Sequence, residues 1–287
     1  IRAGKNAKMV IPDFPSTQFN HIILAVPMQK DTVWLECTSQ TLPAGYLSSF
    51  TCDRDALLVD ADGGKLVHTP QYKIDENLEI RNISAILDLE GTLTLKSRTR
   101  YGGLQQDHYH QLIHQLSKDK IKDYLREQMD FSTYEITGFD YKESLSAHPH
   151  VDETLDISVS NYATVSGKRL FIIPNIMTRN GRKLATDTAR KFPLELGSAY
   201  RDIDTVTIRI PAGYAPESMP ADVSIKSSFG TYTCSVKLNG EQLQYTRSID
   251  HFGGRFPATQ YNDLVKYFEA VYKADRNKVV LVKNATN

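Results

Sequence analysis

His21 and Glu36 are two side chains near the start of the chain whose types could do acid–base chemistry together. They lie toward the two ends of a largely apolar stretch, F-N-H-I-I-L-A-V-P-M-Q-K-D-T-V-W-L-E-C-T, which spans residues 19–38. A carboxylate beside an imidazole fixes the tautomer of the ring, and this prepares a histidine to act as a base toward a nucleophile. The chemistry therefore depends on whether the intervening chain brings the two side chains together.

This stretch has the pattern of a β-hairpin. Apolar residues alternate on both sides of a turn at residues 27–31, where Pro, Gln, Lys and Asp interrupt the strands. Pairing of Ala25 with Thr32 across the turn would set the register. In that register His21 lies directly opposite Glu36, on the same face and with Cβ atoms about 5 Å apart.

A simpler interpretation of this pair also stands. Two facing polar side chains on a hairpin can be a surface cross-strand pair that contributes a few tenths of a kcal/mol. Trp34, two residues before Glu36, is expected on the same face. It would either keep water away from a reacting pair or fill ordinary packing space, and the residues leave both interpretations open.

The sequence F-N-H at residues 19–21 and W-L-E-C-T at residues 34–38 resembles the histidine and acid strands of the transglutaminase-like superfamily. That fold is papain-like and carries a Cys-His-Asp triad. The resemblance implies that His21 is the catalytic base and that Glu36 is the acid, which in most of the superfamily is Asp in a D-x-T context. The chain over residues 11–70 resembles one bacterial subfamily, in which a transglutaminase core lies between two β-rich domains of unknown function.

The nucleophilic cysteine of that superfamily lies upstream of its histidine, and this chain begins at Ile1, too late to include it. We therefore expect the C-terminal part of a longer protein, similar to a cysteine peptidase or transglutaminase. The resemblance implies thiol attack on an amide, by hydrolysis or acyl transfer, with a protein or peptide as substrate. The chain as given is expected to be inactive, because a base without a thiol has nothing to activate.

The three cysteines of this chain are not expected to supply that thiol. Cys37 follows Glu36 on the same strand, so it should point to the opposite face and into the core. Cys52 lies in a loop, and Cys234 falls on the apolar face of a later strand. None is placed to act through His21 unless the loop at Cys52 folds back.

Length and composition are typical of a globular protein of about two domains. The 287 residues are 40% hydrophobic and 24% charged, and the formal net charge is zero. No basic surface for nucleic acid or anionic membrane is indicated, and no apolar run approaches the roughly 18 residues of a transmembrane helix. The odd cysteine count lacks metal-type spacing, which argues against a disulfide framework and a zinc ribbon. No cofactor is expected, and the oligomeric state is left open.

The predicted fold class is α+β, mainly β. We expect residues 1–70 to be the C-terminal part of a transglutaminase-like core, and residues 71–287 to form an antiparallel β-sandwich-like domain. Glu90-Gly91 predicts a two-residue hairpin between two alternating strands. Residues 221–248 predict a three-stranded meander, with turns at Phe229-Gly230 and Asn239-Gly240.

Two amphipathic helices should interrupt these strands, at residues 105–130 and 259–273. Ser117 could divide the first into two shorter helices. Each helix has an apolar stripe and is expected to pack on a sheet rather than in a membrane or a partner's groove. In the second helix the stripe consists of Leu264, Val265, Phe268, Val271 and Tyr272.

His110 and His114 form H-Q-L-I-H, which has the spacing of the zinc motif H-E-x-x-H. Gln111 occupies the position of the glutamate that activates water, and an amide cannot accept that proton. The sequence identifies no third ligand. We therefore predict two histidines on the polar face of a helix and no metal site.

Two classes of function remain. In the first, the parent protein is a thiol-dependent acyl-transfer or amide-hydrolysing enzyme with His21 and Glu36 in its triad. In the second, it is a non-catalytic interaction scaffold with a degenerate transglutaminase-like core, because a fold alone does not decide function. The resemblance places either protein in the bacterial periplasm or cell envelope.

Overall fold

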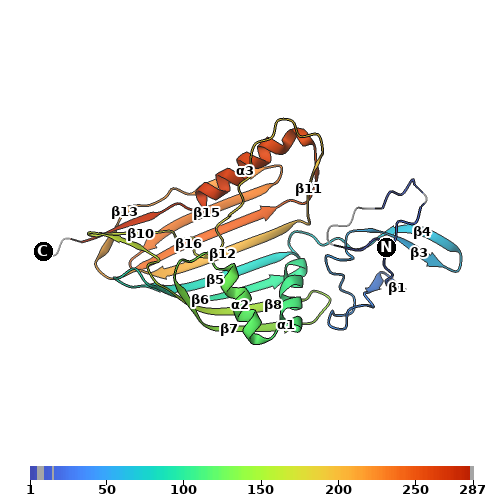
Figure 1. The fold of residues 1–287 in the computed structure, drawn as a ribbon, viewed down its shortest axis with the longest axis horizontal. Helices are drawn as coiled ribbons and strands as arrows, with labels where there is room; N and C mark the ends of the chain where they lie inside the picture. The colour runs from blue at the N-terminus through green and yellow to red at the C-terminus, as the bar shows by residue number, and fades with distance from the viewer. Residues whose placement is uncertain (5–9, 15, 285–287) are drawn as a thin grey trace.

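The computed structural model describes residues 1–4, 10–14 and 16–284, and it has the predicted class, α+β and mainly β (Figure 1). Most of the chain after residue 77 builds around one eight-stranded sheet, drawn across the middle of the figure. In sheet order its strands are β14 (Val223–Ser227), β15 (Gly230–Asn239), β16 (Gln242–His251), β12 (Tyr200–Arg209), β5 (Leu78–Leu87), β6 (Leu93–Gly102), β8 (His150–Val159) and β7 (Tyr134–Ser144).

Side chains along these strands alternate between a buried and an exposed face. In β6, Leu93, Leu95 and Ser97 are buried, whereas Thr94 and Lys96 between them are exposed. A sheet with one face on a core and one in water produces this period of two. The predicted meander is confirmed as β14, β15 and β16, which pair in sequence.

The two halves of the sheet meet at a parallel pair of strands, β5 and β12. Ile83 lies beside Val206 and Ala85 beside Ile208 in this pair. The sequence predicted antiparallel pairing throughout, which holds within each half. The parallel contact joins segments about 120 residues apart, and a local pattern of alternation carries no information about such a partner.

A smaller sheet covers part of the buried face. Its strands, in sheet order, are β13 (Tyr214–Ser218), β18 (Val279–Lys283), β10 (Arg169–Ile172) and β9 (Thr164–Ser166). Leu170, Ile172 and Leu281 of this sheet are fully buried in the same core as Ile208 and Leu243 of the large sheet. Two sheets sharing a core give the expected sandwich-like arrangement. The short strands β11 (Leu194–Leu196) and β17 (Gly254–Phe256) form a separate antiparallel pair.

The helices complete this cover. In place of the first predicted helix, the structure has a short 3-10 turn (Gly103–Gln106) followed by α1 (Asp107–Gln115) and α2 (Lys118–Gln128). The second predicted helix is α3 (Tyr261–Ala274), which a 3-10 turn (Ala258–Gln260) precedes. Ser117 divides α1 from α2 as predicted, because its hydroxyl accepts the Lys120 N–H and caps α2. Leu264, Phe268 and Val271 of α3 are buried in the core, as the stripe predicted. Among the described residues, no helix has the length and apolar character that spanning a bilayer requires.

The loop between β5 and β6 differs from the predicted two-residue hairpin. Leu87 pairs with Leu93, so five residues from Asp88 to Thr92 form the connection. Gly91 has φ +85°, and a Cβ there would lie 2.4 Å from the carbonyl oxygen of Ala163. Glycine is therefore required by a close approach of another segment as well as by the turn.

The N-terminal region, residues 1–70, lies at one end of the large sheet (Figure 1). It contains two small hairpins, β1 (Leu24–Pro27) with β2 (Thr32–Leu35), and β3 (Asp55–Asp60) with β4 (Gly63–His68). It contacts the start of α1, where the Tyr46 hydroxyl donates to Asp107 Oδ1 at 2.5 Å and Ser49 N donates to Asp107 Oδ2 at 2.8 Å. These bonds join the segment between β2 and β3 to the start of α1.

Candidate functional site

His21 and Glu36 meet at the open end of the β1–β2 hairpin. His21 Nε2 lies 3.1 Å from Oε1 and 3.0 Å from Oε2 of Glu36, and the two side chains are 14% and 4% exposed. Both residues lie just outside the paired strands, since β1 begins at Leu24 and β2 ends at Leu35. The expected proximity of the two side chains is thus confirmed.

The register that brings them together differs from the predicted one. Ala25 pairs with Trp34, and Thr32 pairs with Pro27, so the pairing is shifted by two residues and His21 reaches Glu36 diagonally. A shift of one residue would send the side chains to opposite faces, but a shift of two keeps them on the same face. Diagonal neighbours remain within reach of long side chains. The contact was therefore predicted correctly even though the predicted register was wrong.

Glu36 is oriented by the residue two positions later. The Thr38 hydroxyl donates to Glu36 Oε1 at 2.7 Å and the Thr38 backbone N–H donates to the same oxygen at 3.0 Å. Burial raises the pKa of the Glu36 carboxyl, but the hydrogen bonds from Thr38 and His21 outweigh burial and hold its pKa below the ordinary value. The E-C-T sequence therefore has a physical role, because Thr38 keeps the carboxylate charged and aimed at the imidazole.

His21 is held by backbone and ring contacts. The backbone N–H groups of Asn20 and His21 donate to the carbonyl oxygen of Ile1, each at 3.1 Å, and the backbone nitrogen of Ile1 donates to the carbonyl oxygen of His21 at 3.0 Å. The Phe50 ring meets the imidazole edge-on, with centroids 5.1 Å apart. With Nε2 directed at Glu36, Nδ1 is the ring atom that can accept a proton.

The aromatic ring against His21 was not foreseen from sequence. Trp34, for which a wall beside the pair and ordinary packing were both left open, is half-buried in β2 opposite Ala25, and a role beside the pair stays a proposal. Phe50 comes from the loop before β3, fourteen positions beyond Glu36. An isolated aromatic residue in an irregular segment carries no periodic signal, so no sequence pattern singles out Phe50.

Cys37 and Cys52 are both free thiols, and their environments differ. Cys37 was expected in the core but is exposed, because β2 ends at Leu35 and strand alternation no longer applies to it. Cys52 is buried, and burial together with Asp107 and Asp53 raises the pKa of its thiol to about 12. A thiol held protonated is a poor nucleophile.

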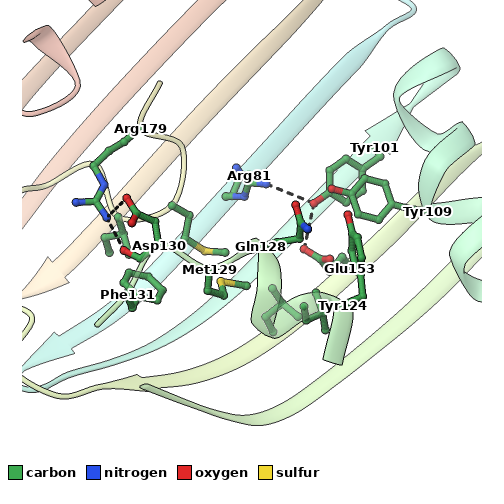
Figure 2. A pocket seen from close by; sticks show the side chains of 14 residues that line it. Arg81, Tyr101, Tyr109, Tyr124, Gln128, Met129, Asp130, Phe131, Glu153 and Arg179 are labelled. Carbon is green, nitrogen blue, oxygen red and sulfur yellow. Dashed lines mark hydrogen bonds and ion pairs between the residues drawn. The ribbon is translucent and has the colours of Figure 1, made fainter. Parts of the chain in front are cut away.

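A cavity of about 140 Å³ lies between α2 and the large sheet. Figure 2 shows Arg81, Tyr101, Gln128 and Glu153 converging on its inner end. Tyr101 Oη donates to Glu153 Oε1 at 3.1 Å, and Arg81 Nη2 donates to Tyr101 Oη at 3.3 Å. Burial raises the pKa of the Glu153 carboxyl. Because Arg81, Tyr101 and Glu153 bond to one another, these three groups form a network that stabilises the core rather than a reacting pair.

The histidines of H-Q-L-I-H do not both lie on a polar helix face, so that prediction was wrong. The His110 side chain is only 4% exposed, and both imidazoles contact Glu143 of β7. Glu143 follows His114 by 29 residues, and its approach depends on the packing of α1 against β7. Sequence spacing could not identify it.

Together the fold and these contacts define a mainly β, α+β protein with an imidazole–carboxylate pair on an N-terminal hairpin. Residues 168–281 match a family described as a domain of unknown function with a solved structure, DUF3858. This match spans β10 to β18, within the sheet domain and away from the His21–Glu36 pair.

No curated protein matches the chain. Among solved structures, it is similar to a crystal structure from Parabacteroides distasonis whose name is "putative protease", with 20% identity and a TM-score of 0.30. The similarity covers 34% of this chain and 19% of that one. The chain thus spans about a fifth of that protein's length.

Proposed function

We propose that His21 and Glu36 are the base and the orienting acid of a thiol-dependent site that hydrolyses or transfers an acyl group from an amide. The observation that carries this proposal is the contact of His21 Nε2 with a buried carboxylate at 3.0 Å, itself fixed by two bonds from Thr38. The sequence resemblance to the transglutaminase-like superfamily supports the same roles. The attacking thiol would come from a part of the protein outside residues 1–287.

The chemistry follows from the tautomer that Glu36 selects. Neutral His21 donates its Nε2–H to Glu36, so Nδ1 accepts the thiol proton and the carboxylate stabilises the resulting imidazolium. The thiolate attacks the carbonyl carbon, and the imidazolium returns the proton to the leaving amine. Water or a second amine then attacks the thioester and gives its proton to His21. His21 passes this proton to the departing thiolate, which restores the thiol. Water gives hydrolysis, and an amine gives transfer to a protein or peptide.

The experiment uses the protein extended by the coding sequence that precedes Ile1. Amide hydrolysis and amine incorporation are measured with a peptide substrate for the wild type and for His21→Ala and Glu36→Gln. Both variants should lose activity, because Glu36→Gln removes the charge that stabilises the imidazolium. His68→Ala is the matched control, since His68 also contacts carboxylates, Asp53 and Asp55, at 2.9 Å within the same region.

Equal activity of His21→Ala and wild type would refute the proposal. Residues 1–287 alone should show no turnover above background. Turnover of that chain abolished by Cys52→Ala would show instead that the buried thiol is the nucleophile.

A non-catalytic scaffold is the second candidate, and one observation favours it. The hairpin exposes apolar side chains, with Ile22 86%, Leu24 52% and Met28 59% exposed. Such a cluster is typical of a surface that binds another protein segment. In this alternative the residues 1–70 form a degenerate transglutaminase-like core and residues 71–287 a separate binding domain, and we propose the periplasm or cell envelope as the location in either case.

A further inference from the structure

Two histidines of α1 and one glutamate of β7 meet where the N-terminal region docks on the sheet. His110 and His114 are one helical turn apart, and their ring centroids lie 4.5 Å from each other. Glu143 Oε1 lies 2.7 Å from His110 Nδ1, and Glu143 Oε2 lies 2.7 Å from His114 Nε2. The ligand-type atoms of these three residues, the His110–His114–Glu143 cluster, all lie within 4.8 Å of one another.

We propose that this cluster binds a divalent transition-metal ion, with Zn²⁺ the best match. Imidazole nitrogen and carboxylate oxygen are zinc ligands at about 2.0–2.2 Å, so ligand atoms of a tetrahedral site lie about 3.4 Å apart. The 2.7 Å contacts between Glu143 and each imidazole need to open by less than an ångström to admit the ion. Three protein ligands leave a fourth position for water.

Thr41 provides a second observation that fits a metal ligand. Its Oγ1 lies 2.8 Å from Nε2 of His110, the nitrogen on the far side of the ring from Glu143. A metal-bound imidazole donates its other N–H to an acceptor, and this bond fixes the tautomer and the ring orientation. Coordination through Nδ1 would put the proton of His110 on Nε2, facing the Thr41 hydroxyl.

The site has a buried side and an accessible side. His110 is 4% and Glu143 16% exposed, whereas His114 is 35% exposed and gives the ion a route from solvent. Thr41 belongs to the segment after β2, so a bound ion would tie the N-terminal region to α1 and β7. Gln111 stands where a hydrolytic zinc helix carries its glutamate base. The proposed role is therefore to stabilise the docked arrangement rather than to activate water.

The test uses the 287-residue chain, freed of metal with a chelator and titrated with Zn²⁺ by calorimetry. A single site should appear, together with a rise in melting temperature, and Co²⁺ should give the visible absorption of a tetrahedral site. Glu143→Gln and His114→Ala should each abolish binding. Thr41→Val should weaken affinity by about 10–100-fold while leaving the stoichiometry unchanged.

His148→Ala is the matched control, because that side chain is 78% exposed and lies outside the cluster. It should bind Zn²⁺ as the wild type does. Absence of wild-type binding would overturn the proposal, and so would equal binding by wild type and His114→Ala. In those outcomes Glu143 serves only as a hydrogen-bond acceptor between two imidazoles. Circular dichroism checks that each variant is folded. If Glu143→Gln does not fold, His114→Ala decides the test, because His114 is the most exposed residue of the cluster.

Discussion

Arg247 Nε lies 3.0 Å from Oδ1 of Asp275, and both side chains are buried. Arg247 belongs to β16 and Asp275 follows α3, so this ion pair joins the large sheet to its cover. The same guanidinium reaches Asp204 Oδ2 of β12 through Nη1 at 2.9 Å. Asp275 Oδ1 also accepts from the Tyr232 hydroxyl at 2.8 Å and from Asn175 Nδ2 at 2.9 Å. The network holds five separate segments at one point.

Removal of one partner should therefore be costly. Asp275→Ala leaves Arg247 buried with part of its charge uncompensated, and we expect a loss of about 3–5 kcal/mol in the free energy of unfolding. Chemical denaturation of the two proteins measures this difference. Asp152→Ala is the control, because its partner Arg100 is 57% exposed and an exposed pair contributes about 0.2–1 kcal/mol. Equal losses in the two variants would show that the buried network does not carry stability.

Phe268 tests the packing of α3. The side chain is 7% exposed and belongs to the shared core, so Phe268→Ala should destabilise the sheet domain by about 3–5 kcal/mol. An isolated helix of this length is marginal in water, and it depends on the sheet face it covers. Lys266→Ala, at a side chain 76% exposed on the same helix, should leave the melting temperature unchanged. An unchanged melting temperature for Phe268→Ala would mean that α3 is a surface element.

Asp250 should make stability depend on pH. Arg201 donates to it through Nε at 2.6 Å and Nη2 at 2.9 Å, and this hydrogen bonding holds the pKa of Asp250 below its ordinary value. A lowered pKa stabilises the fold fully above the ordinary aspartate value of about 3.9, and this stabilisation is lost as the pH falls through the folded-state pKa. Asp250→Asn should cost about 1 kcal/mol at pH 7. Urea unfolding measures the difference in unfolding free energy between wild type and Asp250→Asn, which should be smaller below pH 3 than at pH 7. A difference that does not change with pH would contradict this prediction.

Asp107 should control the docking of the N-terminal region. It accepts the Tyr46 hydroxyl at 2.5 Å and the Ser49 N–H at 2.8 Å. Asp107→Ala leaves the Ser49 N–H without this acceptor and leaves the Tyr46 hydroxyl with the Gly103 carbonyl oxygen, 3.1 Å away, in place of a carboxylate, at a cost of about 1–3 kcal/mol. Limited proteolysis should then cut residues 1–70 faster, while the sheet domain keeps its melting temperature. Asp119→Ala, at an exposed position in α2, should not change the cleavage rate.

Much of the sheet and its helices could be predicted because the signals are local. Alternation along β6 and β8 shows which side of a half-buried strand faces the core, and three- and four-residue spacing does the same for α3. Ser117 could be read as a break because a serine cap is a short-range interaction. The His21–Glu36 contact could also be predicted, since a two-residue error in register preserves the face of each side chain.

The sequence by itself determined the strand and helix pattern and the proximity of His21 to Glu36, because those interactions link residues close in the chain. Tertiary structure alone decided the parallel contact of β5 with β12, and the meeting of Glu143 with the α1 histidines. It also decided that Cys37 is exposed, since the end of β2 at Leu35 depends on how the hairpin is paired. The β5–β12 contact and the position of Glu143 depend on packing between distant segments, and periodicity in one segment does not encode which other segment will lie against it.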